Sequence, residues 1–223
     1  IYGDTDSIFV FLNKTVTLDE ANQIGSYLAD NITKWWKEHL KHDFQLESAL
    51  ELEYETHFSR FVMPTIRGSE KGSKKRYAGM IITQNFNHEN PSVDSFDLVF
   101  KGLETVRTDW THLAREIQKE LYKRIFLKQK YKAYILHIVE QLKLGKLNDK
   151  LIYRKRLRRK LHEYQKNVPP HVQAARKADE WLVSNNKKKR YQHGGWIAYC
   201  YTVNGPEPLE CLTSPLDYEI YIE

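Results

Sequence analysis

The chain opens with Ile1-Tyr2-Gly3-Asp4-Thr5-Asp6-Ser7-Ile8-Phe9-Val10. β-Branched and aromatic residues on either side of a Gly/Asp/Thr segment predict a hairpin of two short strands. Asp4 and Asp6 are two residues apart, so an extended backbone directs both carboxylates to the same side. Carboxylate oxygens suit magnesium, and two of them could hold the ions of a two-metal site. Taken alone, this pattern favours an ordinary acidic turn over a metal site.

The rest of the chain predicts an α+β fold with a boundary near Leu103. A capping-box pattern, Thr17-Leu18-Asp19-Glu20, begins a helix whose apolar residues recur every three or four positions. Leu50 to Glu55 alternates apolar with acidic residues, which indicates a strand. Two further strands are expected before the boundary, at residues 77–83 and 96–100. Beyond it the pattern is mostly helical, with helices expected from Thr108, up to a terminating Gly145 and after Pro169-Pro170, and with one strand at residues 195–203.

Charge is unevenly distributed along the 223 residues. Residues 101–190 hold 25 Lys and Arg against 9 Asp and Glu, whereas the remaining residues hold 10 basic and 20 acidic side chains. A basic block beside an acidic one is typical of a nucleic-acid contact region next to a metal-holding region. Within the block, residues 154–160 contain six basic residues, which suits sequence-independent phosphate contact. The alternative is a solvated surface of mixed charge.

Other features limit the cellular setting. Cys200 and Cys211 are interpreted as ordinary thiols of a reducing cytoplasm, since two cysteines build no disulfide framework and no His cluster accompanies them. No stretch reaches the roughly 20 apolar residues that span a bilayer, and no signal peptide is visible. The missing initiator Met and the abrupt last residues predict a piece of a longer protein.

Three stretches resemble motifs of the family B DNA polymerases and occur in family order. Tyr2-Gly3-Asp4-Thr5-Asp6-Ser7 resembles motif C, Lys74-Lys75-Arg76-Tyr77-Ala78-Gly79 resembles the Lys-x-Tyr element, and residues 101–109 resemble the stretch that opens the thumb. Longer segments are similar to the bacterial polymerase II branch of that family, namely residues 105–110, 153–159, 167–172 and 204–209. The resemblance spans essentially the whole chain. It implies a partial palm at residues 1–103, built as an antiparallel sheet with helices. A mostly helical thumb would follow at residues 104–223, and its C-terminal part can extend beyond these residues.

The resemblance implies a catalytic role for the hairpin. Asp6 would be the direct ligand of two catalytic Mg²⁺ ions, and Asp4 would support the same site electrostatically or as a weak ligand. Tyr2 and Thr5 would shape the turn, with their hydroxyls near the primer terminus. The second metal-binding carboxylate and the nucleotide-gripping fingers motif of the family are absent from this chain. This piece alone is therefore expected to hold Mg²⁺ poorly and not to polymerise.

The same resemblance assigns the DNA contacts. Lys75 and Tyr77 would contact the newly paired duplex through its minor groove and the primer backbone. Lys101 and Arg107 would contact phosphates where the thumb meets the primer. The basic run would contribute further phosphate contacts through Arg154, Lys155, Arg156, Arg158 and Arg159.

The implied function is that of a DNA-directed DNA polymerase with a repair or lesion-bypass role in the bacterial cytoplasm, associated with the nucleoid. Its partners would be primer-template DNA and, in the complete enzyme, deoxynucleoside triphosphates. A sliding clamp is a candidate partner that these residues do not decide, and no membrane is expected. Two alternatives remain at this stage, a non-enzymatic duplex-DNA-binding module and a two-metal nuclease built around Asp4 and Asp6.

Overall fold

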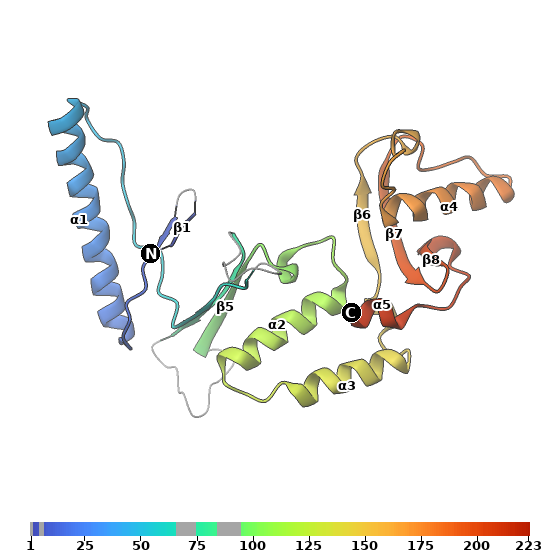
Figure 1. The fold of residues 1–223 in the computed structure, drawn as a ribbon, viewed down its shortest axis with the longest axis horizontal. Coiled ribbons are helices and arrows are strands. Elements are labelled where there is room, and N and C mark those ends of the chain that lie inside the picture. The colour runs from blue at the N-terminus through green and yellow to red at the C-terminus, as the bar shows by residue number, and fades with distance from the viewer. Residues whose placement is uncertain (1, 5–6, 66–74, 84–94) are drawn as a thin grey trace. The chain divides into compact units, whose positions relative to one another are not determined.

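A computed structural model describes residues 2–4, 7–65, 75–83 and 95–223 of the chain (Figure 1). The chain divides into two compact units, Ile1–Leu103 and Glu104–Glu223. Both units combine helices with antiparallel strands. The predicted α+β class is therefore confirmed.

The first unit contains a hairpin, a long helix and a three-stranded sheet. Strands β1 (Tyr2–Asp4) and β2 (Ser7–Phe9) pair antiparallel. Helix α1 (Leu18–Phe44) follows. The sheet has the order β3-β4-β5 and is antiparallel throughout, with bounds Arg60–Val62, Tyr77–Ile82 and Phe96–Lys101. The two strands that sequence periodicity predicts near residues 77–83 and 96–100 are thus present.

Helix α1 begins as its sequence predicts. The Glu20 backbone N–H donates to Thr17 Oγ1 over 3.2 Å, and the Thr17 N–H donates to Glu20 Oε2 over 2.8 Å. This reciprocal pair satisfies two N–H groups that the first turn of a helix leaves without partners. The hydrogen bonds from Thr17 also lower the pKa of Glu20.

The strand predicted at residues 50–55 is wrong, because within the described part of the chain this segment pairs with no strand. It lies instead along α1. The Leu52 N–H donates to Thr33 Oγ1 over 3.0 Å, and the Tyr54 ring sits directly over Gly25, where any Cβ would overlap it. The apolar side chains of this segment do point to one side, but a helix rather than a sheet covers them.

In the sequence of the second unit, helices precede, interrupt and follow the strands of a second antiparallel sheet. Helices α2 (His112–Phe126) and α3 (Lys132–Lys143) come first. The sheet follows in the order β6-β7-β8, with bounds Tyr153–Leu157, Gly195–Thr202 and Gly205–Pro208. Helix α4 (Pro170–Ser184) lies between β6 and β7 in the sequence, and the short α5 (Tyr218–Ile222) ends the unit.

Local end signals decide the bounds of α2 and α3. Thr111, not the predicted Thr108, caps α2, since its hydroxyl accepts the Ala114 N–H over 3.2 Å. Helix α3 ends as predicted at Gly145, which has a φ of 73°. The Lys146 N–H then donates to the Gln141 carbonyl over 3.1 Å and closes the last turn.

Helix α4 covers one face of the β6–β7 sheet. Its small residues allow a close approach, and the shared core consists of Val172, Ala174, Ala175 and Ala178 with Leu157, Leu161, Tyr191, Ile197 and Tyr199. Since side chains alternate along a strand, the residues of β6 and β7 that lie between these core positions point to the opposite face of the sheet.

A buried carboxylate joins α4 to the loop before β7. Asp179 is 3% exposed, and its Oδ1 accepts the backbone N–H groups of Arg190 over 2.7 Å and Tyr191 over 2.9 Å. Its Oδ2 accepts Gln192 Nε2 over 2.9 Å. Four consecutive basic residues, 187–190, lead into this anchored point.

We expect Asp179→Ala to lower the free energy of unfolding by about 2 to 4 kcal/mol, because the backbone N–H groups of Arg190 and of the buried Tyr191 lose their partner. Asp179→Asn should cost about 1 kcal/mol, since one amide oxygen remains and the Gln192 side chain can rotate to accept the new N–H. Urea unfolding followed by circular dichroism measures both losses. Equal losses for the two variants would contradict this account.

Glu207 makes the second unit sensitive to acid. Burial alone would raise the pKa of Glu207, but hydrogen bonds from Ser214 and Thr213 lower it to about 2. The folded state therefore binds this proton less readily than the unfolded state, in which the pKa is 4.5. The stabilisation is complete well above pH 4.5 and is lost as the pH falls toward 2.

We expect protonation of Glu207 to lower the free energy of unfolding by roughly 2 kcal/mol as the pH falls from 5 to 3. Glu207→Gln should be less stable than the parent at pH 7, because an amide N–H₂ would face the donors of Thr213 or Ser214. It should lose less stability than the parent over the same pH interval. Urea unfolding at both pH values tests this, and identical losses in the two proteins would refute it.

Candidate functional site

The hairpin of β1 and β2 carries the motif C resemblance. Asp4 ends β1 and pairs with Ser7, so residues 5 and 6 alone separate the strands in the sequence. Thr5 and Asp6 lie outside the described residues, as do the side chains of Tyr2 and Asp4. Two carboxylate-bearing residues at this position have the donor chemistry that a divalent cation requires. Among the described residues, no group of three or more His, Cys, Asp or Glu side chains lies close enough to hold a metal ion.

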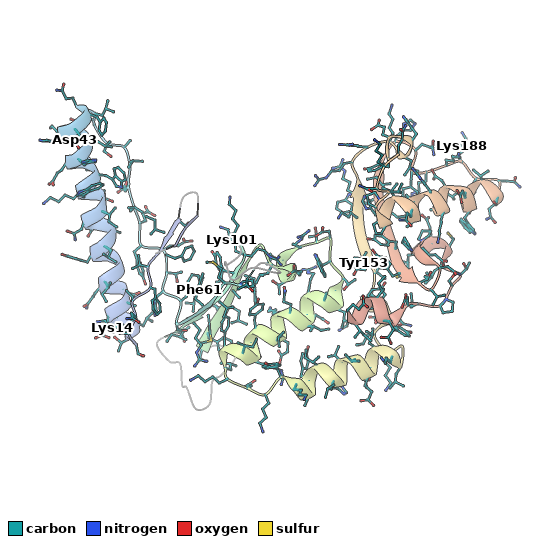
Figure 2. The ribbon with its side chains drawn as sticks, in the orientation of Figure 1. Lys14, Asp43, Phe61, Lys101, Tyr153 and Lys188 are labelled. Carbon is teal, nitrogen blue, oxygen red and sulfur yellow. The ribbon has the colours of Figure 1, made fainter. Side chains whose placement is uncertain are left out.

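An aromatic cluster attaches this hairpin to the sheet of the first unit. The Phe9 ring centroid on β2 lies 5.3 Å from that of Phe61 on β3 and 5.3 Å from that of Tyr77 on β4. Phe61 and Tyr77 are 5.2 Å apart, and Phe58 completes the cluster. Figure 2 marks Phe61 at this position. Tyr77 is therefore 9% exposed, and its ring is part of the core beside the hairpin.

Three predicted DNA contacts meet at one end of the β4–β5 pair. Tyr77 lies directly opposite Lys101 in the register, and Lys75 precedes Tyr77 by two residues. Gly102 has a φ of 64°, and the Lys75 carbonyl occupies the space that a Cβ at Gly102 would need. Both lysines are exposed, and Lys101 extends away from the end of its strand (Figure 2). Residues 26 positions apart in the chain thus form one basic edge.

A carboxylate in the second unit holds two other predicted contacts together. Asp109 accepts Arg107 Nε over 3.0 Å through Oδ1 and Arg107 Nη2 over 2.9 Å through Oδ2. Lys155 Nζ donates to the same Oδ2 over 3.3 Å. The hydrogen bond from Arg107, assisted by Lys155, lowers the pKa of Asp109 to about 2 against the effect of burial. Asp109 therefore stays ionised at neutral pH and fixes both cations.

Strand geometry separates the predicted basic run onto two faces. Arg154 and Arg156 are exposed on the face of β6 that α4 does not cover, whereas Lys155 points to the other face and reaches Asp109. Arg158 and Arg159 follow the strand and are exposed. The run is not one continuous stripe, because successive side chains of a strand alternate in direction.

Two exposed features of the second unit are not among the predicted site residues. Trp196 on β7 lies directly opposite Arg156 and is 62% exposed. Residues 187–190 form a second exposed basic run just before β7. The second run is visible in the sequence as four consecutive cations, but the exposure of Trp196 follows only from the register of β6 with β7.

A cavity of about 500 Å³ lies elsewhere in the second unit. Its lining includes Asn148, Ile152, Cys200, Leu212 and Tyr218, and none of the predicted site residues takes part. Cys200 is buried, and burial raises the pKa of its thiol. In the described part of the chain, no helix is both long and apolar enough to cross a bilayer.

Comparison with known proteins places these elements in a family. The family model described as DNA polymerase family B matches residues 1–215. DNA polymerase II of Escherichia coli (strain K12) is 54% identical over 222 residues, which cover 100% of this chain and 27% of that protein. The DNA polymerase of Archaeoglobus fulgidus is 29% identical over 185 residues, or 81% of this chain and 19% of that protein. The DNA polymerase zeta catalytic subunit of Schizosaccharomyces pombe is 26% identical over 211 residues, or 92% and 12%.

The chain thus spans about a quarter or less of the length of these relatives. The match nevertheless runs through the hairpin, the basic edge of β4–β5 and the basic sheet of the second unit. On this ground the chain belongs to DNA polymerase family B.

Proposed function

We propose that this chain is the motif C part of the palm and the thumb of a DNA-directed DNA polymerase that acts in repair or lesion bypass. The observation that carries the proposal is the 54% identity with a bacterial DNA polymerase II over the whole chain. Primer-template DNA and deoxynucleoside triphosphates would be the substrates of the complete enzyme, near the nucleoid in the bacterial cytoplasm. The division between Leu103 and Glu104 supports a palm at residues 1–103 and a thumb at residues 104–223.

The hairpin would supply the catalytic carboxylates. Asp6 would ligate the metal ions directly, and Asp4 would add negative charge or a weak bond at the end of β1. When bound, two divalent ions, which we take to be Mg²⁺, would assist attack of the primer 3′-hydroxyl on the α-phosphate and stabilise the charge of the leaving pyrophosphate. Tyr2 and Thr5 would position the primer terminus beside these carboxylates.

The basic edge of the first unit would hold the newly made duplex. Lys75 and Lys101 supply charge at one end of β4–β5, and Tyr77 lies directly opposite Lys101 in the register. The Tyr77 ring packs against Phe9 of the hairpin, so its position is tied to that of motif C. A displacement of the Tyr77 ring would therefore be transmitted to β2 of the hairpin through this contact.

The second unit would hold the phosphate backbone. Asp109 immobilises Arg107 and Lys155, so these cations lose little side-chain entropy when a phosphate binds. Arg154, Arg156, Arg158 and Arg159 add exposed charge. Contact with phosphates alone carries no sequence preference, as a polymerase requires.

In the complete polymerase, we expect Asp6→Ala to lower primer extension by roughly 10³-fold or more, because metal stabilisation contributes several kcal/mol in the transition state. Binding of primer-template duplex should change by less than about threefold, since phosphate contacts provide most of the affinity. Asp30→Ala, at an exposed position of α1, is the matched control and should extend primers normally. Full extension by Asp6→Ala would refute the assignment.

The salt dependence of duplex binding tests the proposed phosphate contacts of Arg158 and Arg159. Arg158→Gln and Arg159→Gln together should reduce the slope of log K against log salt for duplex binding by up to about 1.8, or about 0.9 for each phosphate that is no longer neutralised. Fluorescence anisotropy of a labelled duplex across salt concentrations gives this slope. Lys37→Gln on α1 is the control for removal of a positive charge. An unchanged slope in the double variant would remove these two arginines from the interface.

A further inference from the structure

The face of β6–β7 opposite α4 presents an aromatic ring among cations. Arg156 pairs directly with Trp196, and Arg154 pairs directly with Ala198. Directly opposed residues of an antiparallel pair project to the same face, with Cβ atoms about 4.5 to 5.5 Å apart. These four side chains therefore share one surface, from which Ile197 and Leu157 point away into the core under α4.

The indole of Trp196 has little cover on this surface. It is 62% exposed, and the next side chain on the same face of its strand is only a methyl group, that of Ala198. Gly194 and Gly195 precede it with φ values of 99° and 126° and carry no side chains that could shield it. A flat ring left this open directly opposite an arginine is free to stack on a planar group of another molecule.

Further positive charge follows Arg156 along the chain. Arg158, Arg159 and Lys160 leave β6 at the end where Trp196 lies, and all three are exposed. The surface is therefore complementary to a polyanion that also offers flat apolar faces.

Nucleic acid with unpaired bases has that chemistry. In a duplex the bases stack on one another, and a protein surface reaches mainly the phosphates. In a single strand each base offers a free π-face, and proteins that bind single strands combine a basic surface with aromatic stacking. An acidic peptide would use the arginines but would leave the indole without a partner.

We propose that Trp196 stacks on an unpaired base, and that Arg154 and Arg156 contact the adjoining phosphates, so that this face of the thumb binds a single-stranded segment of the DNA substrate. The inference rests on the proposed function and adds to it, because phosphate contacts alone would not distinguish single-stranded from double-stranded DNA. A template overhang or a nucleotide displaced from the duplex would supply the base.

The test uses the complete polymerase and fluorescence anisotropy with three DNA probes: a labelled primer-template with a single-stranded overhang, a blunt duplex, and the same primer-template with abasic residues in the overhang. Trp196→Ala should weaken binding to the overhang DNA by about five- to a hundredfold, the usual effect of losing one stacked base. Binding to the blunt duplex should change by less than about twofold, and the salt slope should stay the same because the variant keeps every charge.

The abasic probe isolates the stacking. With it, the parent and Trp196→Ala should bind equally, because no base is present to stack. Trp196→Phe should restore most of the affinity for the normal overhang. Trp181→Ala is the matched control, since this tryptophan is 37% exposed on α4 and has the Lys187 ammonium 5.5 Å from its ring centroid. It should bind all three probes like the parent.

Three other outcomes would each overturn one part of the proposal. If Trp196→Ala binds the overhang like the parent while Arg154→Gln with Arg156→Gln lowers the salt slope, the stacking inference fails and the phosphate contacts stand. If Trp196→Ala weakens the abasic probe as much as the normal one, the indole does not act on a base. If none of these variants alters binding, this face is no DNA surface, although Asp6→Ala still tests the polymerase assignment separately.

Discussion

The contact of Phe9 with Tyr77 joins the two parts of the first unit on which its proposed chemistry depends. The hairpin β1–β2 has only three residues in each strand, too few to stay ordered without support. The rings of Phe58, Phe61 and Tyr77 provide that support on one side of the sheet. Removing any of these rings would loosen the hairpin before it changed the sheet, since β3, β4 and β5 keep their own ladder of hydrogen bonds.

Sequence reasoning succeeds here wherever the signal is local. The capping box at Thr17, the end of α3 at Gly145 and the strands β4, β5 and β7 depend on neighbouring residues, and all are present. Motif resemblance identifies the family correctly because it rests on six consecutive specified residues. The roles of the individual site residues remain proposals, as does the assignment of the two units to palm and thumb.

Sequence reasoning fails where the partner is distant. Alternation at residues 50–55 correctly indicates one apolar side, but it does not say that α1 covers this side. The bond between Lys155 and Asp109 joins residues 46 positions apart, and nothing in either neighbourhood predicts it. A run of basic residues likewise does not reveal that it is divided between two faces, because the division requires residues 153–157 to form a strand, in which successive side chains alternate in direction.

The anchor at Asp179 gives ionic strength two opposite effects on the second unit. Residues 187–190 are four adjacent cations that repel one another, and the buried carboxylate holds the loop to α4 through its hydrogen bonds from Arg190 and Tyr191. Dissolved salt screens the repulsion and so favours the folded loop. The same screening weakens attraction to a polyanion. High salt should therefore order this loop best and weaken its attraction to a polyanion most. At low salt its cations repel one another most strongly, and attraction to a polyanion is then also strongest.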